Sequence, residues 1–477
     1  MSLIEVDVDY LNADGDGVAR IGRNELIVPF TIPGERVRVE RTHASPVATL
    51  IEVVTPSPSR VTPGCAHFGP CGGCAWQHIA YPEQLRLKTA LVERLVRAVV
   101  SAVPAVRPTL SPHASNGSTP GRLVPDAPDG TPWGYRQKVH FVFASAGGHN
   151  GRRQSRGSLV MGHYARGSRR LVPVHECPVH DERGNALAFQ FAASLKSSGI
   201  EAADSRTSDA RSGRGTAGGV LRSVAVRVAL HTHELMTTLV VSDDRDKRLR
   251  SATRRAIDES GASTSLHVNL HPKGDRFIFG AETRRISGQA RLREEIDGTA
   301  FLISPTAFFQ TNVRAAAVLV GLVREAIPSG ATVLDLYAGA GLFALPLARA
   351  GHRVTAVDEN RAAVADGVAS QRLNQIPEDR CRFIAQPVES ALGRLPSTDA
   401  IVIDPPRSGC SASVLEALCL RAVPRLIYVS CNPDALARDL VTLTRGGFRV
   451  DSLQPVDMFP HTAHVETVVV LSSARDA

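Results

Sequence analysis

The stretch Val333-Leu-Asp-Leu-Tyr-Ala-Gly-Ala-Gly341 decides the fold of this chain. A short apolar run that contains an acidic residue leads directly into a turn with two glycines. From about Leu302 onward, apolar runs of this kind alternate with amphipathic helical patterns. The expected strands lie at 333–336, 353–357, 382–384, 400–403 and 425–429, with helices beginning at about Ala340 and Arg361. This regular alternation predicts an α/β domain built on a largely parallel sheet with helices on both faces.

The glycine turn is a candidate ligand site, because ligands of such sheets bind beyond the carboxyl ends of the strands. Gly339 and Gly341 allow the backbone to approach a ligand closely, and Asp358, at the end of the next strand, can accept hydrogen bonds from a ribose. The run from Gly339 to Ala344 also satisfies the dinucleotide fingerprint, with alanine in its third place, so NAD is one interpretation. The acidic Asp335 ahead of the glycines favours S-adenosylmethionine instead.

Two further strand ends carry reactive side chains. Ser430-Cys-Asn-Pro433 follows the apolar run 426–429, and Asp404-Pro-Pro-Arg407 follows the run 400–403. A cysteine at the end of a strand is usually a small buried hydrophobe. A cysteine delivered to the sheet edge beside an acidic Pro-Pro loop is unusual for a structural thiol, and Cys431 is therefore a candidate nucleophile.

The chain is 477 residues long, which exceeds one ordinary core and predicts two or three domains. Residues 1–57 alternate apolar and polar side chains between turns, which predicts a small five-stranded β-barrel. Residues 58–290 combine a helical pattern with short β-like runs and predict a central mixed α+β domain. Residues 291–477 hold the α/β domain. Two segments rich in small and polar residues, at about 101–132 and 203–219, are expected to be poorly ordered insertions.

The formal net charge of +8 is concentrated in one region. Residues 133–255 contain 21 Lys and Arg against 10 Asp and Glu, a net +11, so the remainder of the chain sums to −3. The positive charge of this region is suited to binding a polyanion such as RNA. A solvated arginine-rich surface is the equal alternative, because aromatic residues make up only 5% of the chain. The sequence has no apolar stretch of membrane-spanning length and no targeting pattern, so a cytoplasmic protein without a membrane partner is expected. The protein is also expected to be a monomer.

Four of the eight cysteines indicate a metal site. Cys65, Cys71 and Cys74 form a Cys-x5-Cys-x2-Cys pattern, and Cys177 follows far downstream. A cytosolic chain seldom uses such spacing for disulfides, so a metal is the better interpretation. Four thiolates suit zinc or an iron–sulfur cluster equally well by count. The other cysteines of the α/β domain, apart from Cys431, are expected to pack in its core.

Five motifs together resemble the RNA uracil-5-methyltransferase family, in which they occur in the same order. They are Phe308-Phe-Gln-Thr-Asn312, Asp335-Leu-Tyr-Ala-Gly-Ala-Gly341, Asp404-Pro-Pro-Arg-Ser-Gly409, Ser430-Cys-Asn-Pro433 and His464-Val-Glu466. The resemblance covers nearly the whole chain and is to the ribosomal-RNA type that contains an iron–sulfur cluster. At the N-terminus, Gly15-Asp-Gly-Val-Ala-Arg20 and the runs 27–30 and 32–37 resemble a TRAM domain, a small OB-like RNA-binding barrel.

The resemblance implies a Rossmann-like class I methyltransferase domain that uses S-adenosylmethionine. The residues that it implies for donor binding are Gln310, Tyr337, Gly339, Asp358 and Asp404. It also implies a [4Fe-4S] cluster, with zinc as the less favoured alternative, on Cys65, Cys71, Cys74 and Cys177. The implied partner is RNA, of which 23S ribosomal RNA is favoured and transfer RNA remains open.

The implied reaction can also be argued from chemistry. Uracil C5 is a poor nucleophile towards a methyl sulfonium, because the ring is electron-deficient. Addition of the Cys431 thiolate at C6 produces an enolate whose electron density lies on C5, which can then take the methyl group. Glu466 is the implied base that removes the C5 proton before the thiol leaves. Two other classes stay open: an NAD-linked oxidoreductase, which uses neither residue, and a noncatalytic RNA-binding or redox-sensing protein on the same frame.

Overall fold

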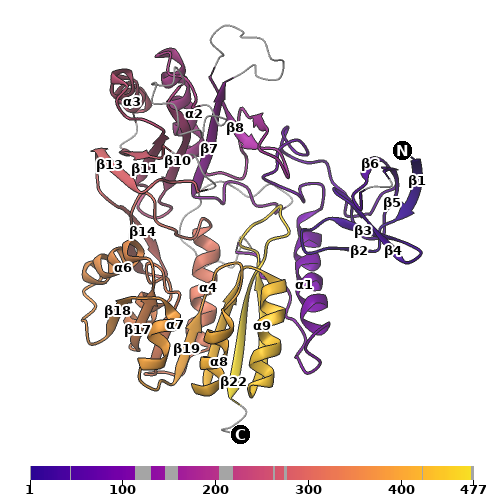
Figure 1. Ribbon diagram of the computed structural model, residues 1–477, viewed down its shortest axis with the longest axis vertical. Coiled ribbons are helices and arrows are strands. Elements are labelled where there is room, and N and C mark those ends of the chain that lie inside the picture. The colour runs from indigo at the N-terminus through magenta and orange to yellow at the C-terminus, as the bar shows by residue number, and fades with distance from the viewer. Residues whose placement is uncertain are drawn as a thin grey trace, which may run out of the picture.

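The computed structural model describes residues 2–42, 45–112, 130–145, 159–203, 219–261, 264–272, 277–421 and 423–473. Figure 1 shows three regions: a C-terminal α/β region, a central region built on a mixed sheet, and a small N-terminal all-β unit. The predicted insertions fall largely on residues 113–129 and 204–218, which lie outside the described residues. In the part of the chain that the structure describes, no helix has the length and apolar character needed to cross a bilayer.

The C-terminal region is built on a seven-stranded sheet of order β18-β17-β16-β19-β20-β22-β21. Neighbouring strands run parallel except that β22 is antiparallel to both of its neighbours. The strands are β16 (Thr332–Leu336), β17 (Arg353–Asp358), β18 (Cys381–Ala385), β19 (Ala400–Ile403), β20 (Arg425–Ser430), β21 (Phe448–Val456) and β22 (Glu466–Ser473). This arrangement confirms the predicted α/β fold with its largely parallel sheet.

Helices cover both faces of this sheet, and its central strands are therefore apolar without alternation. All four residues of β19 are buried. One face packs against α4 (Val313–Glu325) and α5 (Ala344–Arg349), and the other against α8 (Ala412–Arg421) and α9 (Pro433–Arg445). The remaining helices of this region are α6 (Arg361–Leu373) and the short α7 (Val388–Ala391).

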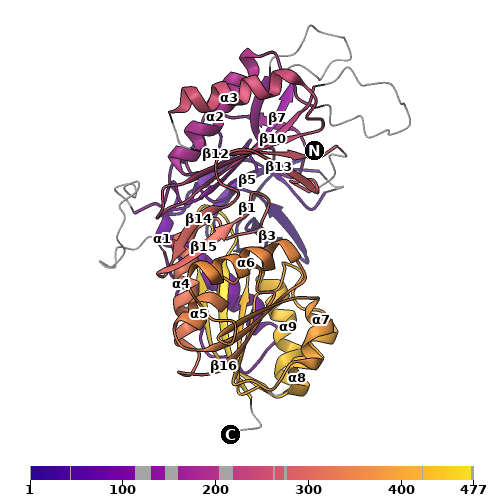
Figure 2. The ribbon, with the colours of Figure 1, turned by 90° about the vertical axis from the view of Figure 1, so that its left-hand side faces the viewer.

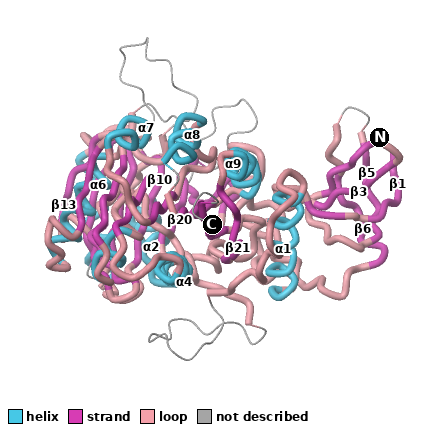
Figure 3. Tube along the Cα trace, turned by 90° about the horizontal axis from the view of Figure 1, so that it is seen from below, coloured by secondary structure: helices cyan, strands magenta, loops and turns pink. Residues whose placement is uncertain are grey.

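Helix α1 (Tyr81–Arg97), which the sequence places in the central domain, packs instead on the C-terminal region. Val92 and Val96 are fully buried in the core that contains α8 and α9, and Figure 3 shows α1 next to β21 and α9. Residues 103–112 continue beside β21, with hydrogen bonds from Arg107 N to Leu453 O (3.0 Å) and from Leu110 N to Pro455 O (2.9 Å). Composition predicts poor order for this segment. The segment is ordered instead, because it pairs with an edge strand, and composition does not predict this pairing.

The central region holds a seven-stranded mixed sheet of order β13-β12-β11-β10-β7-β8-β9. Its strands are β7 (Lys138–Ser145), β8 (Leu159–Tyr164), β9 (Leu171–Pro173), β10 (Leu221–Val228), β11 (Leu235–Val241), β12 (Thr264–Leu270) and β13 (Glu282–Ser287). Helices α2 (Glu182–Ser197) and α3 (Lys247–Ser260) share a core with this sheet and lie on its side away from the C-terminal region (Figure 2). A hairpin of β14 (Leu292–Ile296) and β15 (Thr299–Ile303) leads from this sheet to α4.

The described residues of the N-terminal unit form six short strands in two three-stranded sheets, where the sequence predicts five strands in one barrel. One sheet contains β1 (Ser2–Asp7), β5 (Arg36–Arg41) and β6 (Thr49–Thr55), and the other contains β2 (Tyr10–Leu11), β3 (Gly17–Ile21) and β4 (Asn24–Val28). The additional strand arises because the chain leaves β1 at Val8, whose N–H donates to Glu35 O, and then pairs with β3 as β2. The unit has an apolar core of its own and lies beside α1.

Candidate active site and cysteine site

The turn after β16 holds its backbone in conformations that few side chains tolerate. Tyr337, Gly339 and Gly341 have φ angles of 61°, 54° and 86°. A Cβ on Gly341 would lie 2.7 Å from Phe383 Cζ, so any other residue here would displace the Phe383 ring of β18. The Gly339 N–H donates to the Asp358 carboxylate at 2.8 Å, which joins the turn to the end of β17.

Asp335 is fully buried at the base of this turn. Its carboxylate accepts a hydrogen bond at 2.9 Å from the N–H of Ala344, the first residue of α5. Burial, and after it the charge of Asp404, raises the pKa of Asp335 well above the ordinary range for a carboxyl group. The acidic residue of the motif therefore ties the glycine turn to the helix that follows it.

The pairing of β20 with β22 brings Cys431 beside Glu466. The antiparallel register ends with Ser430 opposite Thr467, so Cys431, which directly follows β20, comes next to Glu466, the first residue of β22. Asp404 follows β19, which pairs with the other edge of β20. Glu466 is only 4% exposed, and Cys431 and Asp404 are half-buried. A thiol and two carboxyl groups from three neighbouring strands thus lie at one edge of the sheet.

Burial and mutual repulsion favour the neutral forms of these three groups. Burial, followed by the charges of Glu466 and Asp404, raises the pKa of the Cys431 thiol to about 12. Burial and the charge of Asp404 raise the pKa of Glu466 to about 8, and burial raises the pKa of Asp404 to about 7. Arg407 acts in the opposite direction on the pKa of Cys431 and of Glu466. Such a cluster of strongly shifted groups is typical of a functional site.

The two loops that carry Asp404 and Cys431 are bonded to each other. Asn432 Nδ2 donates to Arg407 O at 2.9 Å, which holds the Pro-Pro loop against the cysteine loop. Asn432 also caps α9, because its Oδ1 accepts a hydrogen bond from Asp434 N at 3.1 Å. The residue after Cys431 therefore fixes this loop from two sides.

Gln310 lies in the loop before α4 and is 8% exposed. Its neighbour Asn312 donates from Nδ2 to Met458 O at 3.0 Å, which brings this loop to the segment that leads into Glu466. Phe308, two residues before Gln310, is 72% exposed. Phe308 belongs to the first of the five sequence motifs, but the motif predicts no role for it. Exposure of so large an aromatic side chain in a motif loop indicates a functional role, and only the structure reveals this exposure.

Cys65, Cys71, Cys74 and Cys177 line a single cavity of about 210 Å³. All eight cysteines of the chain are among the described residues, and all are free thiols. Burial, with added repulsion from the other thiols, raises the pKa of Cys74 to about 11 and that of Cys177 to about 12. Two backbone N–H groups face thiol sulfurs: those of His67 and Gly73 lie 3.4 Å from the Sγ atoms of Cys65 and Cys71. The structure thus places the four predicted ligands around one cavity.

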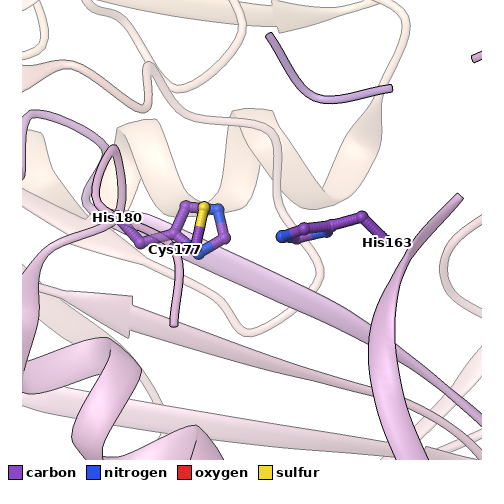
Figure 4. A group of neighbouring side chains, drawn as sticks. All are labelled: His163, Cys177 and His180. Carbon is purple, nitrogen blue, oxygen red and sulfur yellow. The ribbon is translucent and has the colours of Figure 1, made fainter. Parts of the chain in front are cut away.

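Two histidines that the cysteine spacing does not predict lie at the same cavity. His163 comes from β8 and His180 from the segment before α2, and their ligand atoms and that of Cys177 lie within 4.8 Å of one another (Figure 4). Burial lowers the pKa of His163 to about 4 and that of His180 well below its usual value, so both imidazoles are neutral at pH 7. The short spacing from Cys177 to His180 is a signal in the sequence. His163 lies on a separate strand and has no such signal.

Two models of known protein families match this chain, one in its C-terminal half and one at its N-terminus. The family model described as tRNA (Uracil-5-)-methyltransferase matches residues 230–474. The chain belongs to the RNA uracil-5-methyltransferase family. A second model, the TRAM domain of tRNA (uracil(54)-C(5))-methyltransferase, matches residues 4–59 and confirms the predicted TRAM domain of this family member.

Relatives of this family member extend over its whole length. An uncharacterized RNA methyltransferase of Gloeobacter violaceus is 34% identical over 98% of this chain and 96% of its own. Another, of Thermosynechococcus vestitus, is 35% identical over 99% and 98%. The crystal structure of Pyrococcus abyssi tRNA (uracil-54, C5)-methyltransferase in complex with S-adenosyl-L-homocysteine is 24% identical, covers 98% of this chain and 100% of that chain, and has a TM-score of 0.74. These comparisons confirm the predicted enzyme class and the class I methyltransferase fold.

Proposed function

We propose that this protein transfers a methyl group from S-adenosylmethionine to C5 of a uridine in RNA through a covalent bond between Cys431 and C6. The observation that carries the proposal is the position of Cys431 beside Glu466 on paired strands. The reaction needs a nucleophile at C6 and a base at C5, which are adjacent carbons of the ring. A thiol and a carboxyl group side by side meet both needs.

The proposed donor site is the glycine turn and the strand ends around it. Asp358, which Gly339 N holds at 2.8 Å, keeps lone pairs for the ribose hydroxyls. Tyr337 and Gln310 lie on the two loops that would enclose the donor, and Asp404 would face its sulfonium. The acidic groups at this edge complement a cationic donor, and a bound sulfonium would lower the pKa of these carboxyl groups.

The proposed reaction has three steps. The Cys431 thiolate adds to C6, and the electron pair of the C5–C6 double bond moves into an enolate. C5 then attacks the methyl group, so that the C5–CH3 bond forms and S-adenosylhomocysteine leaves. Finally the Glu466 carboxylate takes the C5 proton, the double bond re-forms, and the C6–Sγ bond breaks. The raised pKa of Glu466 makes it a stronger base once it is ionised.

The four cysteines are the proposed ligands of a [4Fe-4S] cluster, with zinc as the alternative. Four thiols around one cavity, with backbone N–H groups facing two of the sulfurs, fit the hydrogen-bonded thiolates that hold such clusters. A bound cluster would act as a cross-link between Cys177 and the segment from Cys65 to Cys74. Four protein thiolates leave no open iron position for substrate chemistry, so the proposed role is structural or in placing RNA.

The proposed RNA is 23S ribosomal RNA, and transfer RNA is the second candidate. The four-cysteine pattern favours the ribosomal substrate through the family type that it resembles. The descriptions of both matching family models and of the Pyrococcus abyssi structure name tRNA enzymes, which favours the second candidate. Mapping 5-methyluridine in both RNAs, from cells with and without this protein, distinguishes the two substrates.

RNA that carries 5-fluorouridine at the target position tests the covalent mechanism. Fluorine cannot leave as a proton, so wild-type protein with the methyl donor should form an adduct that survives denaturing electrophoresis. Cys431→Ala should form none while still binding the donor. Cys419→Ala, which removes another half-buried thiol of the same region, should form the adduct normally. An adduct with Cys431→Ala, or none with wild-type protein under conditions of turnover, would refute the mechanism.

A further inference from the structure

The loop that joins β21 to β22, residues 457–465, leads directly into Glu466 and is held from outside its own sheet. Four successive carbonyl oxygens of this loop each accept hydrogen bonds. The donors are Asn312 Nδ2 to Met458, Lys88 Nζ to Phe459, Tyr135 Oη to Pro460, and the N–H groups of Ala75 and Trp76 to His461, all at 2.9–3.0 Å. Connecting loops normally run over the surface and leave such groups to water. In Figure 1 the yellow chain above β22 accordingly reaches into the region beside α1.

His461 is the centre of these contacts. It is 1% exposed and has a φ of 65°, a strained conformation that persists only where the surroundings hold it. Its ring stacks on Trp133 with the centroids 4.3 Å apart. Its N–H donates to Gln84 Oε1 at 2.8 Å, while Gln84 Nε2 donates to Trp76 O at 3.2 Å and to Ile79 O at 2.9 Å. Gln84, on α1, therefore joins the loop to the segment that follows the cysteine triplet.

Cys431 is held in place by contacts other than those of loop 457–465. It lies at the end of β20, and Asn432 fixes its loop through α9 and the Pro-Pro loop. Glu466 is the first residue of β22, where it pairs with Val456 of β21, and it directly follows the loop, so the contacts of the loop act on its N-terminal side. The two reacting side chains are thus positioned by different contacts, although they are neighbours on paired strands.

We propose that Gln84 and Tyr135 are positioning residues for proton removal: through loop 457–465 they hold Glu466 against the C5 proton. This inference rests on the proposed function and extends it to residues that do not touch the RNA base. Loss of either hydrogen bond should impair the release of methylated product more than the formation of the covalent bond.

The amount of methylated covalent adduct on ordinary uridine RNA distinguishes a misplaced Glu466 from a general loss of activity. Proton removal follows methyl transfer, so a misplaced Glu466 leaves the C6–Sγ bond intact with the new methyl group already on C5. With label in the methyl group of the donor, Gln84→Met and Tyr135→Phe should accumulate about tenfold more labelled adduct than wild type, which corresponds to a release barrier about 1.4 kcal/mol higher. Their adduct formation on 5-fluorouridine RNA should stay within about twofold of wild type.

Matched variants control for the loss of a buried polar group. Gln371, on α6, is also a buried glutamine whose Nε2 donates to two carbonyls, those of Ile376 and Cys381. Tyr81, on α1, donates its hydroxyl to Ser111 Oγ at 2.9 Å. Gln371→Met and Tyr81→Phe should release methylated RNA at the wild-type rate. Glu466→Gln should accumulate the same labelled adduct as the positioning variants.

The outcomes distinguish this inference from the proposed function. If Gln84→Met and Tyr135→Phe slow adduct formation and release by equal factors, the positioning role is wrong while the covalent mechanism stands. If Glu466→Gln releases product at the wild-type rate, Glu466 is not the base and both ideas fail. Tyr135→Phe removes a single oxygen atom and carries the test even if Gln84→Met does not fold.

Discussion

Glu466 and Cys431 are adjacent, and their different pKa values should separate the two halves of the reaction in their pH dependence. Release of methylated RNA needs ionised Glu466, so its rate should rise with pH and level off above about 8. Adduct formation needs the Cys431 thiolate, whose pKa of about 12 keeps this rate rising over the whole range. Single-turnover measurements between about pH 6 and pH 9.5 test both slopes. A release rate that is flat over this range would contradict the assignment of Glu466.

The same residue should lower the stability of the protein at high pH. The folded-state pKa of Glu466 lies above its ordinary value of 4.5, so its contribution to stability is complete below that value and is lost as the pH rises through about 8. Glu466→Gln, which cannot ionise, should change the free energy of unfolding little at about pH 5 and raise it by about 1–3 kcal/mol at about pH 9. Denaturant titration measures the difference. Glu416→Gln, at an exposed site on α8, is the matched control for the substitution itself.

Gly341 combines a positive φ with a close approach to the Phe383 ring, which a side chain at this position would have to displace. Gly330 has a similar φ of 71° but open space around it, so Gly330→Ala should cost about 1–2 kcal/mol from backbone strain alone. Gly341→Ala should cost about 1–3 kcal/mol more, because its Cβ would meet Phe383. It should also weaken donor binding by about tenfold, equivalent to 1.4 kcal/mol. Denaturation and calorimetric titration test this, and equal losses in the two variants would exclude the Phe383 contact as the cause.

At the scale of elements, a buried ion pair joins α1 to the start of loop 457–465. Lys88 is fully buried and donates to Asp457 Oδ1 at 2.5 Å. Lys88→Met should lower the free energy of unfolding by about 3–5 kcal/mol, because it leaves the Asp457 carboxylate buried without its partner. Lys88→Met combined with Asp457→Asn should recover most of that loss in denaturant titrations. Similar losses in the single and double variants would show that packing of the lysine stem, and not charge, holds α1 in place.

Local sequence patterns predict most of the helices and strands, but they do not predict which elements pack against one another. The five parallel strands and the glycine turn of the C-terminal sheet lie where apolar runs and glycines predict them, because these signals act over a few residues. Helix α1 also shows its periodicity in the sequence. Its packing against α9 depends on residues more than 300 positions away, which no local pattern encodes.

At the scale of the whole molecule, the cysteine site links the segment before α1 to the segment before α2. Protein purified without oxygen should contain about four iron and four sulfide per chain if the bound group is a [4Fe-4S] cluster. Cys177→Ser should lose this content and melt at a lower temperature, because a group that binds only the folded chain stabilises it. Cys419→Ser should keep both properties. One zinc per chain, with no sulfide, would show that the bound group is zinc and not a [4Fe-4S] cluster.

The sequence alone determined the α/β architecture, the family motifs and the four cysteines, because periodicity, turn residues and spacing are properties of neighbouring positions. Only the tertiary structure decided that β22 returns antiparallel beside β20 and so places Glu466 next to Cys431. It also decided that His163 lies near Cys177, and that α1 and loop 457–465 hold each other. These arrangements arise from burial and hydrogen bonds between residues far apart in the chain, and their free energies exist only once the whole core has formed.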